Sequence, residues 1–318
     1  MTKNIGVIME MDDRGLKDAD LGMITLARQK DTHLFAFALN GSDETLKEKL
    51  SSYGVSTLVD IRLAEGLQHN PEVRAKAVIE VVKKFGISAV FGLSTARGKD
   101  LLPRIAALLD APLVMDCFYV DLEANIAETS RYSGKTLAKI KLTGPVPVFG
   151  IRPNAKEPVE DPLEARIIQF DAGFIVSNQL RVVAGEAGKG SGINLSEAEI
   201  VISGGRGMKN GENFSLLFEC AKKFHAAVGA SRVAVDSGWV PYAMQVGQTG
   251  EKVSPKVYIA CGVSGSIQHF AGMKTSGMVI ALNQDKTAPI MSNCDYYAVA
   301  DALEVIPELT KLLEKSGC

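Results

Sequence analysis

The sequence predicts an α/β protein of two domains, and two observations carry that prediction. Short apolar runs rich in β-branched residues alternate with segments of helical period from the N-terminus onward, and the alternation restarts after a stretch rich in glycine and serine at 185–194. The chain has 318 residues, 46% of them hydrophobic and 23% charged, which is enough for two such domains. We therefore expect an N-terminal domain over 1–190 and a C-terminal domain over 191–318.

The first half of the chain reads as a series of β-α-β units. Strands are expected at 4–10, 32–39, 57–61 and 89–94, and helices around 18–30, 42–54, 71–86 and 98–109. Ser42 with Thr45, and Pro71, are typical of helix starts, whereas Gly54 and Gly86 are typical of helix ends. Beyond Pro112 only strand-like runs remain, so an antiparallel addition should complete a mainly parallel sheet.

The second half predicts a doubly wound parallel sheet. Its expected strands, each leading into a loop or helix, are 198–203, 232–236, 256–260, 276–283 and 296–300. In such sheets a ligand binds outside the carboxyl ends of the strands, at the switch point of the winding. The loops expected there are rich in glycine and polar residues, and backbone N–H groups at helix starts bind phosphate. This favours a nucleotide-type ligand, although every α/β domain has loops and a purely structural interpretation stays open.

Composition excludes several classes of protein. The net charge of −2 gives no basic surface of the kind that nucleic-acid-binding proteins carry. The N-terminus reaches Glu10 before a signal-peptide core is complete, and no run of about 18 uncharged apolar residues occurs, so we expect a cytoplasmic protein without a transmembrane segment. The cysteines lie far apart in the sequence, which predicts free thiols and no zinc or iron–sulfur site: Cys117, Cys220, Cys261, Cys294 and Cys318.

The motifs leave the kind of nucleotide open. The segment 204–211 reads GGRGMKNG, which matches the dinucleotide fingerprint GxGxxG only in part, because Asn210 stands where the third glycine belongs. Asp236, at the end of the next expected strand, would hold a ribose, so an NAD-dependent oxidoreductase is one reading. A non-redox nucleotide-binding or scaffolding subunit is another. Walker A, HExxH and GxSxG motifs are absent, so neither P-loop ATP hydrolysis nor hydrolase chemistry is supported.

A set of motifs adds a resemblance to these readings. They are VISGGRGMKNGEN (201–213), AAVGASRVAVDSGWVP (226–241), QVGQTG (245–250), KVYIACGVSGSIQHFAGMK (256–274), IALNQDKTAPIM (280–291) and YYAVADALEVIPEL (296–309). In order and spacing they resemble the alpha subunit of electron-transfer flavoprotein. The segments 97–117, RYSGK (131–135) and GIRP (150–153) are similar to its N-terminal domain, so the resemblance spans nearly the whole chain.

The resemblance implies an FAD in the C-terminal domain. The residues expected along it are Arg206, Ser231, Arg232, Val246, Gly247, Gln248, Thr249, Ser264, Gly265, Ser266, Ile267, Gln268, His269, Asn283 and Asp301. His269 and Arg232 would supply positive charge near N1 and the C2 carbonyl, and Thr249 a hydroxyl near N5. Asn283 and Asp301 would hold the adenosine side, where the sequence after Asn283 departs from the family's usual pattern. A structural reading stays open for two groups: His269 as a helix cap, and the arginines 206 and 232 as partners of Asp236 or of helix ends.

The resemblance also implies partners. The N-terminal domain should pair with a beta subunit in a heterodimer, and the joint at 185–192 should tether the flavin domain so that it can move between redox partners. FAD would accept electrons from a dehydrogenase, of the acyl-CoA type, and pass them on one at a time. The protein would then be an electron carrier without a substrate of its own. Whether it belongs to an NADH-linked bifurcating system depends on the beta subunit.

Overall fold

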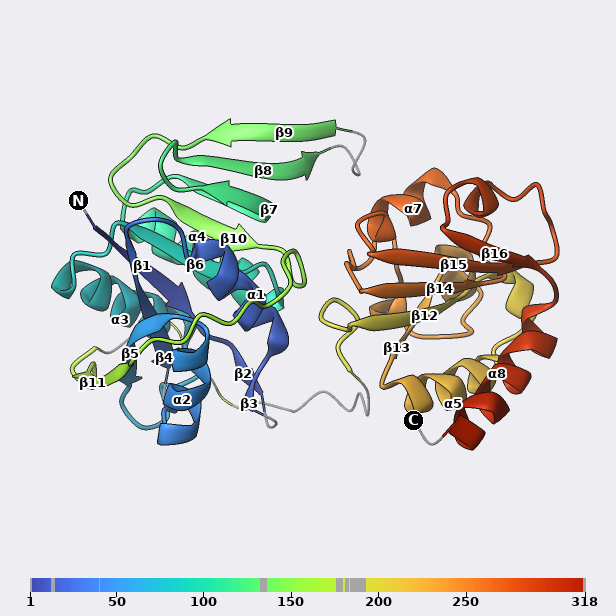
Figure 1. Cartoon of the computed structure of the whole chain (residues 1–318), viewed down its shortest axis with the longest axis horizontal. Coiled ribbons are helices and arrows are strands. Elements are labelled where there is room, and N and C mark those ends of the chain that lie inside the picture. The colour runs from blue at the N-terminus through green and yellow to red at the C-terminus, as the bar shows by residue number, and fades with distance from the viewer. Residues whose placement is uncertain are drawn as a thin grey trace. The chain divides into compact units, whose positions relative to one another are not determined.

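The computed structural model describes residues 2–12, 15–39, 41–131, 136–175, 180, 183 and 193–316. The chain divides into two compact units, here called the first and the second unit: Met1–Ser130 with Leu137–Gly188, and Arg131–Thr136 with Lys189–Cys318 (Figure 1). The joint expected at 185–192 and the boundary expected at 190 lie outside the described residues, as does most of RYSGK, at 132–135.

One large, mostly parallel sheet forms the described core of the first unit. Its strands are β1 (Lys3–Ile8), β4 (Thr32–Leu39), β5 (Val55–Arg62), β6 (Ala89–Leu93), β7 (Leu113–Asp121), β8 (Ile126–Arg131), β9 (Thr136–Lys141), β10 (Val148–Ile151) and β11 (Arg166–Asp171). They lie in the order β11-β5-β4-β1-β6-β10-β7-β8-β9. A small hairpin of β2 (Met11–Asp12) and β3 (Gly15–Leu16) follows β1.

Helices cover both faces of this sheet, which gives the first unit two apolar cores. On one face α1 (Asp18–Ala27) and α2 (Glu44–Ser52) pack against the strands. On the other face lie α3 (Pro71–Lys84) and α4 (Ala96–Leu108). The α/β class and the helices at 71–86 and 98–109 are therefore confirmed to within a few residues at each end.

The predicted helix signals hold with one exception. Helix α3 begins at Pro71, as expected. Gly54 and Gly86 follow α2 and α3 with φ of +87° and +57°, values that favour glycine at a helix end. The cap of α2, however, is Asp43 rather than Ser42, because the Asp43 carboxylate accepts a hydrogen bond of 2.7 Å from the backbone of the first turn.

The strands beyond Pro112 differ in direction from the expected antiparallel addition. β8 pairs antiparallel with β7, but β10 lies parallel to both β6 and β7, and β11 lies parallel to β5. The path of the segment between β10 and β11 explains why β11 lies parallel to β5. It runs back along the helices, where Asp161 forms an ion pair with Arg28 at 3.2 Å and its backbone N–H donates to Ser52. This path returns the chain to the edge beside β5 in the parallel direction.

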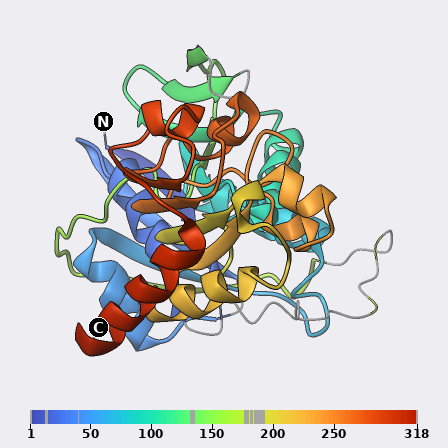
Figure 2. The same cartoon turned by 90° about the vertical axis from the view of Figure 1, so that its right-hand side faces the viewer.

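The second unit is a five-stranded parallel sheet within residues 193–316. Its strands are β12 (Ile200–Gly204), β13 (Ala227–Ala230), β14 (Val257–Cys261), β15 (Met278–Asn283) and β16 (Tyr296–Val299), in the order β13-β12-β14-β15-β16. Helices α5 (Phe214–Phe224) and α8 (Ala302–Ser316) lie side by side on one face (Figures 1 and 2). On the other face, helix α7 (Ile267–Met273) and the loops close a second core.

One expected strand is wrong. Residues 232–236 form the short helix α6 (Arg232–Asp236), and the strand at this place in the sheet is β13, at 227–230. The alternation RVAVD is typical of a strand, but the Ser231 hydroxyl accepts from the backbone N–H of Ala234 and caps a helical turn instead. The preceding helix correspondingly ends at Phe224, where His225 adopts a left-handed conformation.

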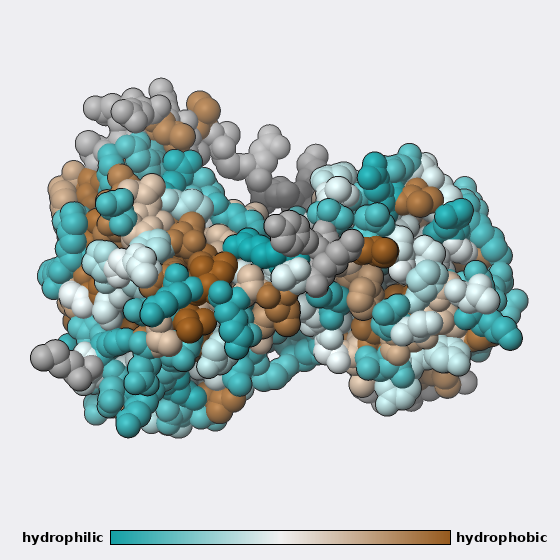
Figure 3. Space-filling view, turned by 90° about the horizontal axis from the view of Figure 1, so that it is seen from above, coloured by the Kyte–Doolittle hydropathy of each residue, from teal (hydrophilic) through white to brown (hydrophobic). Residues whose placement is uncertain are grey.

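The surface of both units mixes hydrophilic and hydrophobic residues in the view of Figure 3. No helix in the part of the chain that the structure describes has the length and apolar character needed to cross a membrane.

Candidate functional site

The loops at the carboxyl ends of the strands of the second unit bring the sequence-predicted residues to one edge of its sheet. The switch point lies between β12 and β14, because the chain goes from β12 to β13 on one side and then to β14 on the other. We call this the carboxyl edge; it comprises residues 204–209, 230–232, 245–251, 262–269, 283–290 and 300–301. Every residue that the sequence analysis assigned to the cofactor lies on it.

The loops after β12 and β14 cross in direct backbone contact at the switch point. The N–H of Gly205 donates to Cys261 at 2.9 Å, and the N–H of Gly207 donates to Gly262 at 3.0 Å. A Cβ on Gly262 would lie 2.7 Å from the Cα of Gly207, and Gly262 has φ of +60°. Only glycine satisfies both conditions, so this crossing fixes the floor of the carboxyl edge.

The QVGQTG loop is held against helix α7. The N–H of Gln248 donates to the carbonyl of Gln268 at 2.8 Å, and the N–H of Val246 donates to Ala230 at 2.9 Å. A Cβ on Gly272 would lie 2.5 Å from the Cα of Gly247, so loop and helix touch without side chains between them. These contacts join the loops that follow β13 and β14.

The Thr249 side chain is oriented by a neighbour in the same loop. The Nε2 of the buried Gln245 donates to Thr249 Oγ1 at 2.9 Å, and the Tyr242 hydroxyl donates to the Thr249 carbonyl. Because the Thr249 hydroxyl oxygen already accepts, its own proton remains free to be donated outward. Thr249 itself is exposed.

His269 is buried in helix α7 and uses one ring nitrogen inside the protein. Its Nε2 lies 2.9 Å from the hydroxyl of Tyr258, a fully buried residue of β14. Its Nδ1 is buried without a hydrogen bond to any described residue. Burial lowers the pKa of His269 to about 4, and a contact with the backbone of Val246 offsets this only in part. At neutral pH the imidazole is therefore uncharged.

The two arginines are the exposed cations of the predicted set. Arg206 lies in the loop after β12, and Arg232 begins helix α6. The Nε of Arg232 forms an ion pair of 3.2 Å with Asp236 one helical turn away, as the structural reading had it. Because Asp236 belongs to a helix and faces this arginine, it does not end a strand. The NAD-dependent reading thus loses the carboxylate on which it relied.

The residues expected on the adenosine side, Asn283 and Asp301, form hydrogen bonds and an ion pair with other residues of the chain. Asn283 Nδ2 donates to the carbonyl of Val263 at 2.9 Å, and Asn283 Oδ1 accepts from Asp285 at 3.0 Å. Asp301 accepts from Lys209 Nζ at 2.9 Å, and this bond is the main cause that lowers the pKa of its carboxyl. Asn283 therefore ties two loops together, and the Asp301–Lys209 pair joins the loop after β16 to the loop after β12.

Comparison with known proteins decides the family. Residues 5–173 match the electron transfer flavoprotein domain, and residues 194–274 match the electron transfer flavoprotein FAD-binding domain. The chain belongs to the electron transfer flavoprotein alpha-subunit family. It is 36% identical over 306 residues to the electron transfer flavoprotein subunit alpha of Pseudomonas aeruginosa, covering 96% of this chain and 98% of that protein. Its identity to the subunit alpha of Bacillus subtilis is 36% over 320 residues, covering 98% and 97%. Its identity to the mitochondrial subunit alpha of Oryza sativa subsp. indica is 37% over 328 residues, covering 96% and 89%.

The carboxyl edge fits the FAD of electron transfer flavoproteins. The buried Nδ1 of His269 lacks a partner among the described residues, and buried polar atoms usually have one. The crossing of Gly205, Gly207 and Gly262 leaves backbone without side chains at the switch point, where a cofactor diphosphate approaches in sheets of this kind. The second unit thus carries the FAD-binding domain of the family.

Sequence reasoning missed three residues that shape this FAD-binding domain. Tyr258 was read as part of an apolar strand, although a tyrosine buried on both sides needs a partner for its hydroxyl. Lys209 follows the glycine motif and holds Asp301, and its role depends on a residue 92 positions away. Gln245 opens the QVGQTG motif, yet only the structure shows that it orients Thr249.

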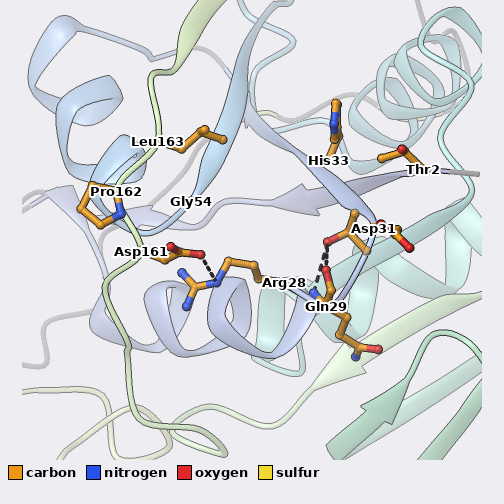
Figure 4. A pocket seen from close by; sticks show the side chains of 10 residues that line it. Thr2, Arg28, Gln29, Asp31, His33, Gly54, Asp161, Pro162 and Leu163 are labelled. Carbon is orange, nitrogen blue, oxygen red and sulfur yellow. Dashed lines mark hydrogen bonds and ion pairs between the residues drawn. The ribbon is translucent and has the colours of Figure 1, made fainter.

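A separate surface pocket lies in the first unit (Figure 4). It has a volume of about 330 Å³ and is lined by residues that include Arg28, His33, Gly54 and Asp161. The pocket opens near the amino ends of β1 and β4, opposite the edge at which ligands of α/β sheets bind. Arg28 is already paired with Asp161, so its charge is compensated within the protein. We assign no cofactor to this pocket.

Proposed function

We propose that this chain is the alpha subunit of an electron transfer flavoprotein heterodimer and carries electrons on an FAD bound at the carboxyl edge of the second unit. Electrons would come from a dehydrogenase of the acyl-CoA type and pass to a downstream acceptor. One observation carries the proposal: the loops after β12 to β16 converge on one edge, where Gly262 crosses Gly207 and His269 offers a buried nitrogen without a partner.

Different residues of this chain would hold different parts of the cofactor. FAD supplies one-electron steps when it is bound. Thr249 would donate its free hydroxyl proton toward N5, and His269 would offer Nδ1 toward the pyrimidine end. In the FAD-free protein His269 is uncharged at pH 7, so we assign the positive charge expected at this end to Arg232. The backbone of 264–268 would hold the diphosphate, and the rest of the cofactor would be held by Arg206, Ser231, Asn283 and Asp301.

The first unit is proposed to pair with the beta subunit. The match to the electron transfer flavoprotein domain over residues 5–173 supports this, since it accounts for nearly all the described residues of that unit. We thus propose that residues 1–190 pair with the beta subunit and that residues 191–318 bind the cofactor.

The visible absorption spectrum of the chain purified with its beta subunit tests the proposal. We expect flavin bands that bleach when an acyl-CoA and an acyl-CoA dehydrogenase are added. If only a dehydrogenase of another type bleached the bands, that enzyme would replace the acyl-CoA dehydrogenase as the proposed electron donor. A colourless complex that fails to rebind FAD would refute the carrier function itself.

The Arg232→Gln variant of this complex should weaken FAD binding about 10- to 150-fold. The change removes a positive charge beside the cofactor, and a charge-assisted contact contributes about 1.5–3 kcal/mol. Equilibrium dialysis of FAD measures the effect. Lys222→Gln is the matched control, because Lys222 is an exposed cation on α5, on the face of the sheet away from α7. Equal affinities for the two variants would count against the role of Arg232.

A further inference from the structure

We infer that Tyr258 is a positioning residue for His269: its phenol donates a hydrogen bond to Nε2 and thereby places the imidazole proton on Nδ1. The inference rests on the proposed function, in which Nδ1 is the nitrogen offered to the flavin. A proton on Nδ1 makes that nitrogen a donor toward the acceptor atoms of the pyrimidine end, whereas a bare Nδ1 would meet them with a lone pair.

The geometry ties the two side chains together across the core. The Tyr258 hydroxyl and His269 Nε2 are 2.9 Å apart, and the rings meet edge to face with centroids 6.2 Å apart. Tyr258 is 0% exposed and His269 is 5% exposed, so water does not compete for either group. Since Tyr258 stands on β14 and His269 on α7, the bond fixes the imidazole relative to the sheet.

The surroundings of Nδ1 decide the direction of this hydrogen bond. A neutral imidazole carries one proton, on Nδ1 or on Nε2. The backbone of Val246 lies near the imidazole, and its N–H is already donated to Ala230. Because Nε2 faces the Tyr258 hydroxyl, Nδ1 is the ring atom left on the Val246 side, where it forms no hydrogen bond. What Val246 can present to Nδ1 is therefore its carbonyl oxygen, which attracts an N–H and repels a lone pair. The proton belongs on Nδ1, and Nε2 must accept from the phenol.

Ser203 completes the arrangement behind the phenol. Its side chain is fully buried on β12, interacts with Tyr258, and makes no hydrogen bond of ordinary geometry to another described residue. Burial raises the pKa of the Tyr258 phenol, so the phenol stays protonated. When His269 takes up a proton, Nε2–H must donate, and the phenol can turn its own O–H toward Ser203. Within the part of the chain that the structure describes, Tyr258 is the titratable group bonded to the imidazole, and Cys261 acts on the Tyr258 phenol.

Nitrogen NMR of the imidazoles in the full chain with its beta subunit tests the inference without FAD. We label histidine with ¹⁵N and read the tautomer of His269 at pH 7 in the wild type and in Tyr258→Phe. The wild type should show a protonated Nδ1 and a bare Nε2, and the variant should show a mixture or the opposite tautomer. The exposed His225 serves as the internal reference. Tyr297→Phe, which removes an exposed phenol from β16, is the matched control and should keep the wild-type signals.

A second variant keeps the test decisive if Tyr258→Phe does not fold. Ser203→Ala should retain the wild-type tautomer at pH 7 but shift the titration of His269 to lower pH, because the protonated form loses its adapting hydroxyl. A protonated Nε2 in the wild type, an unchanged tautomer in Tyr258→Phe, or an unshifted titration in Ser203→Ala would each overturn the inference. Failure of the complex to bind FAD would refute the proposed function and leave these NMR outcomes readable.

Discussion

Gly262→Ala is expected to destabilise the second unit by about 2–5 kcal/mol and to abolish FAD retention. Two costs add at this position. A residue with a Cβ at φ of +60° loses about 1–2 kcal/mol relative to glycine. The new Cβ would also lie 2.7 Å from the Cα of Gly207, and forcing atoms into a filled space costs about 1–3 kcal/mol. Because the contact is with backbone, the loop after β12 must move, and the switch point moves with it.

Urea unfolding followed by tryptophan fluorescence measures this effect in the second unit, since Trp239 is the chain's one tryptophan. Gly238→Ala is the matched control. Gly238 has φ of +72°, but a Cβ there would meet nothing within 4 Å, so only the cost of the left-handed backbone applies. The difference in unfolding free energy between the two variants therefore measures the cost of the steric clash between residue 262 and Gly207. Equal losses of stability, or Gly262→Ala with wild-type FAD affinity, would contradict the steric argument.

Acidification should destabilise the FAD-free protein through His269. Its pKa falls from the ordinary 6.5 to about 4 on folding, so below pH 6.5 the unfolded chain binds a proton that the folded chain does not. Stability is then fully present above pH 6.5 and is lost as the pH falls toward 4. The loss amounts to about 3 kcal/mol at its limit, from 1.36 kcal/mol for each pKa unit.

The slope of unfolding free energy against pH checks this expectation. In His269→Asn the slope between pH 6.5 and 4 should be much smaller than in the wild type, whatever the variant's stability at pH 7. His225→Asn is the matched control, because His225 is exposed and asparagine tolerates its left-handed backbone. A wild-type slope in His269→Asn would show that other groups cause the acid sensitivity.

Much of the fold followed from local pattern. The strand at 32–39 was predicted to the residue, because its apolar run from Leu34 to Leu39 between turn signals leaves few alternatives. The prediction of a strand at 232–236 was wrong because local pattern misleads there. Its alternation suits a strand, but the cap at Ser231 and the neighbouring strand β13 make the segment helical. The direction of β11 depends on the path of 152–165 across α1 and α2, which local pattern does not encode.

The candidate site was predictable where topology decides it. Parallel strands place their carboxyl ends at one edge, so loops far apart in sequence had to meet there. The partners within the edge were not predictable. That Tyr258 takes Nε2 of His269, and that burial keeps the imidazole neutral, depends on the depth of α7 in the core. The same holds for Gln245, whose contact with Thr249 needs the turn that brings them together.

The Lys209–Asp301 ion pair bears on the order of events during synthesis. These residues are 92 positions apart: Lys209 lies in the loop after β12, the first of the carboxyl edge to be made, and Asp301 lies in the loop after β16, the last. A nascent chain that has emerged through the loop after β15 holds four of the five loops and still lacks Asp301 and the helix α8 that packs beside α5. The carboxyl edge is therefore completed at its β16 side only after Asp301 and α8 have emerged, so Lys209 waits for its partner until the other strands of the sheet have been made.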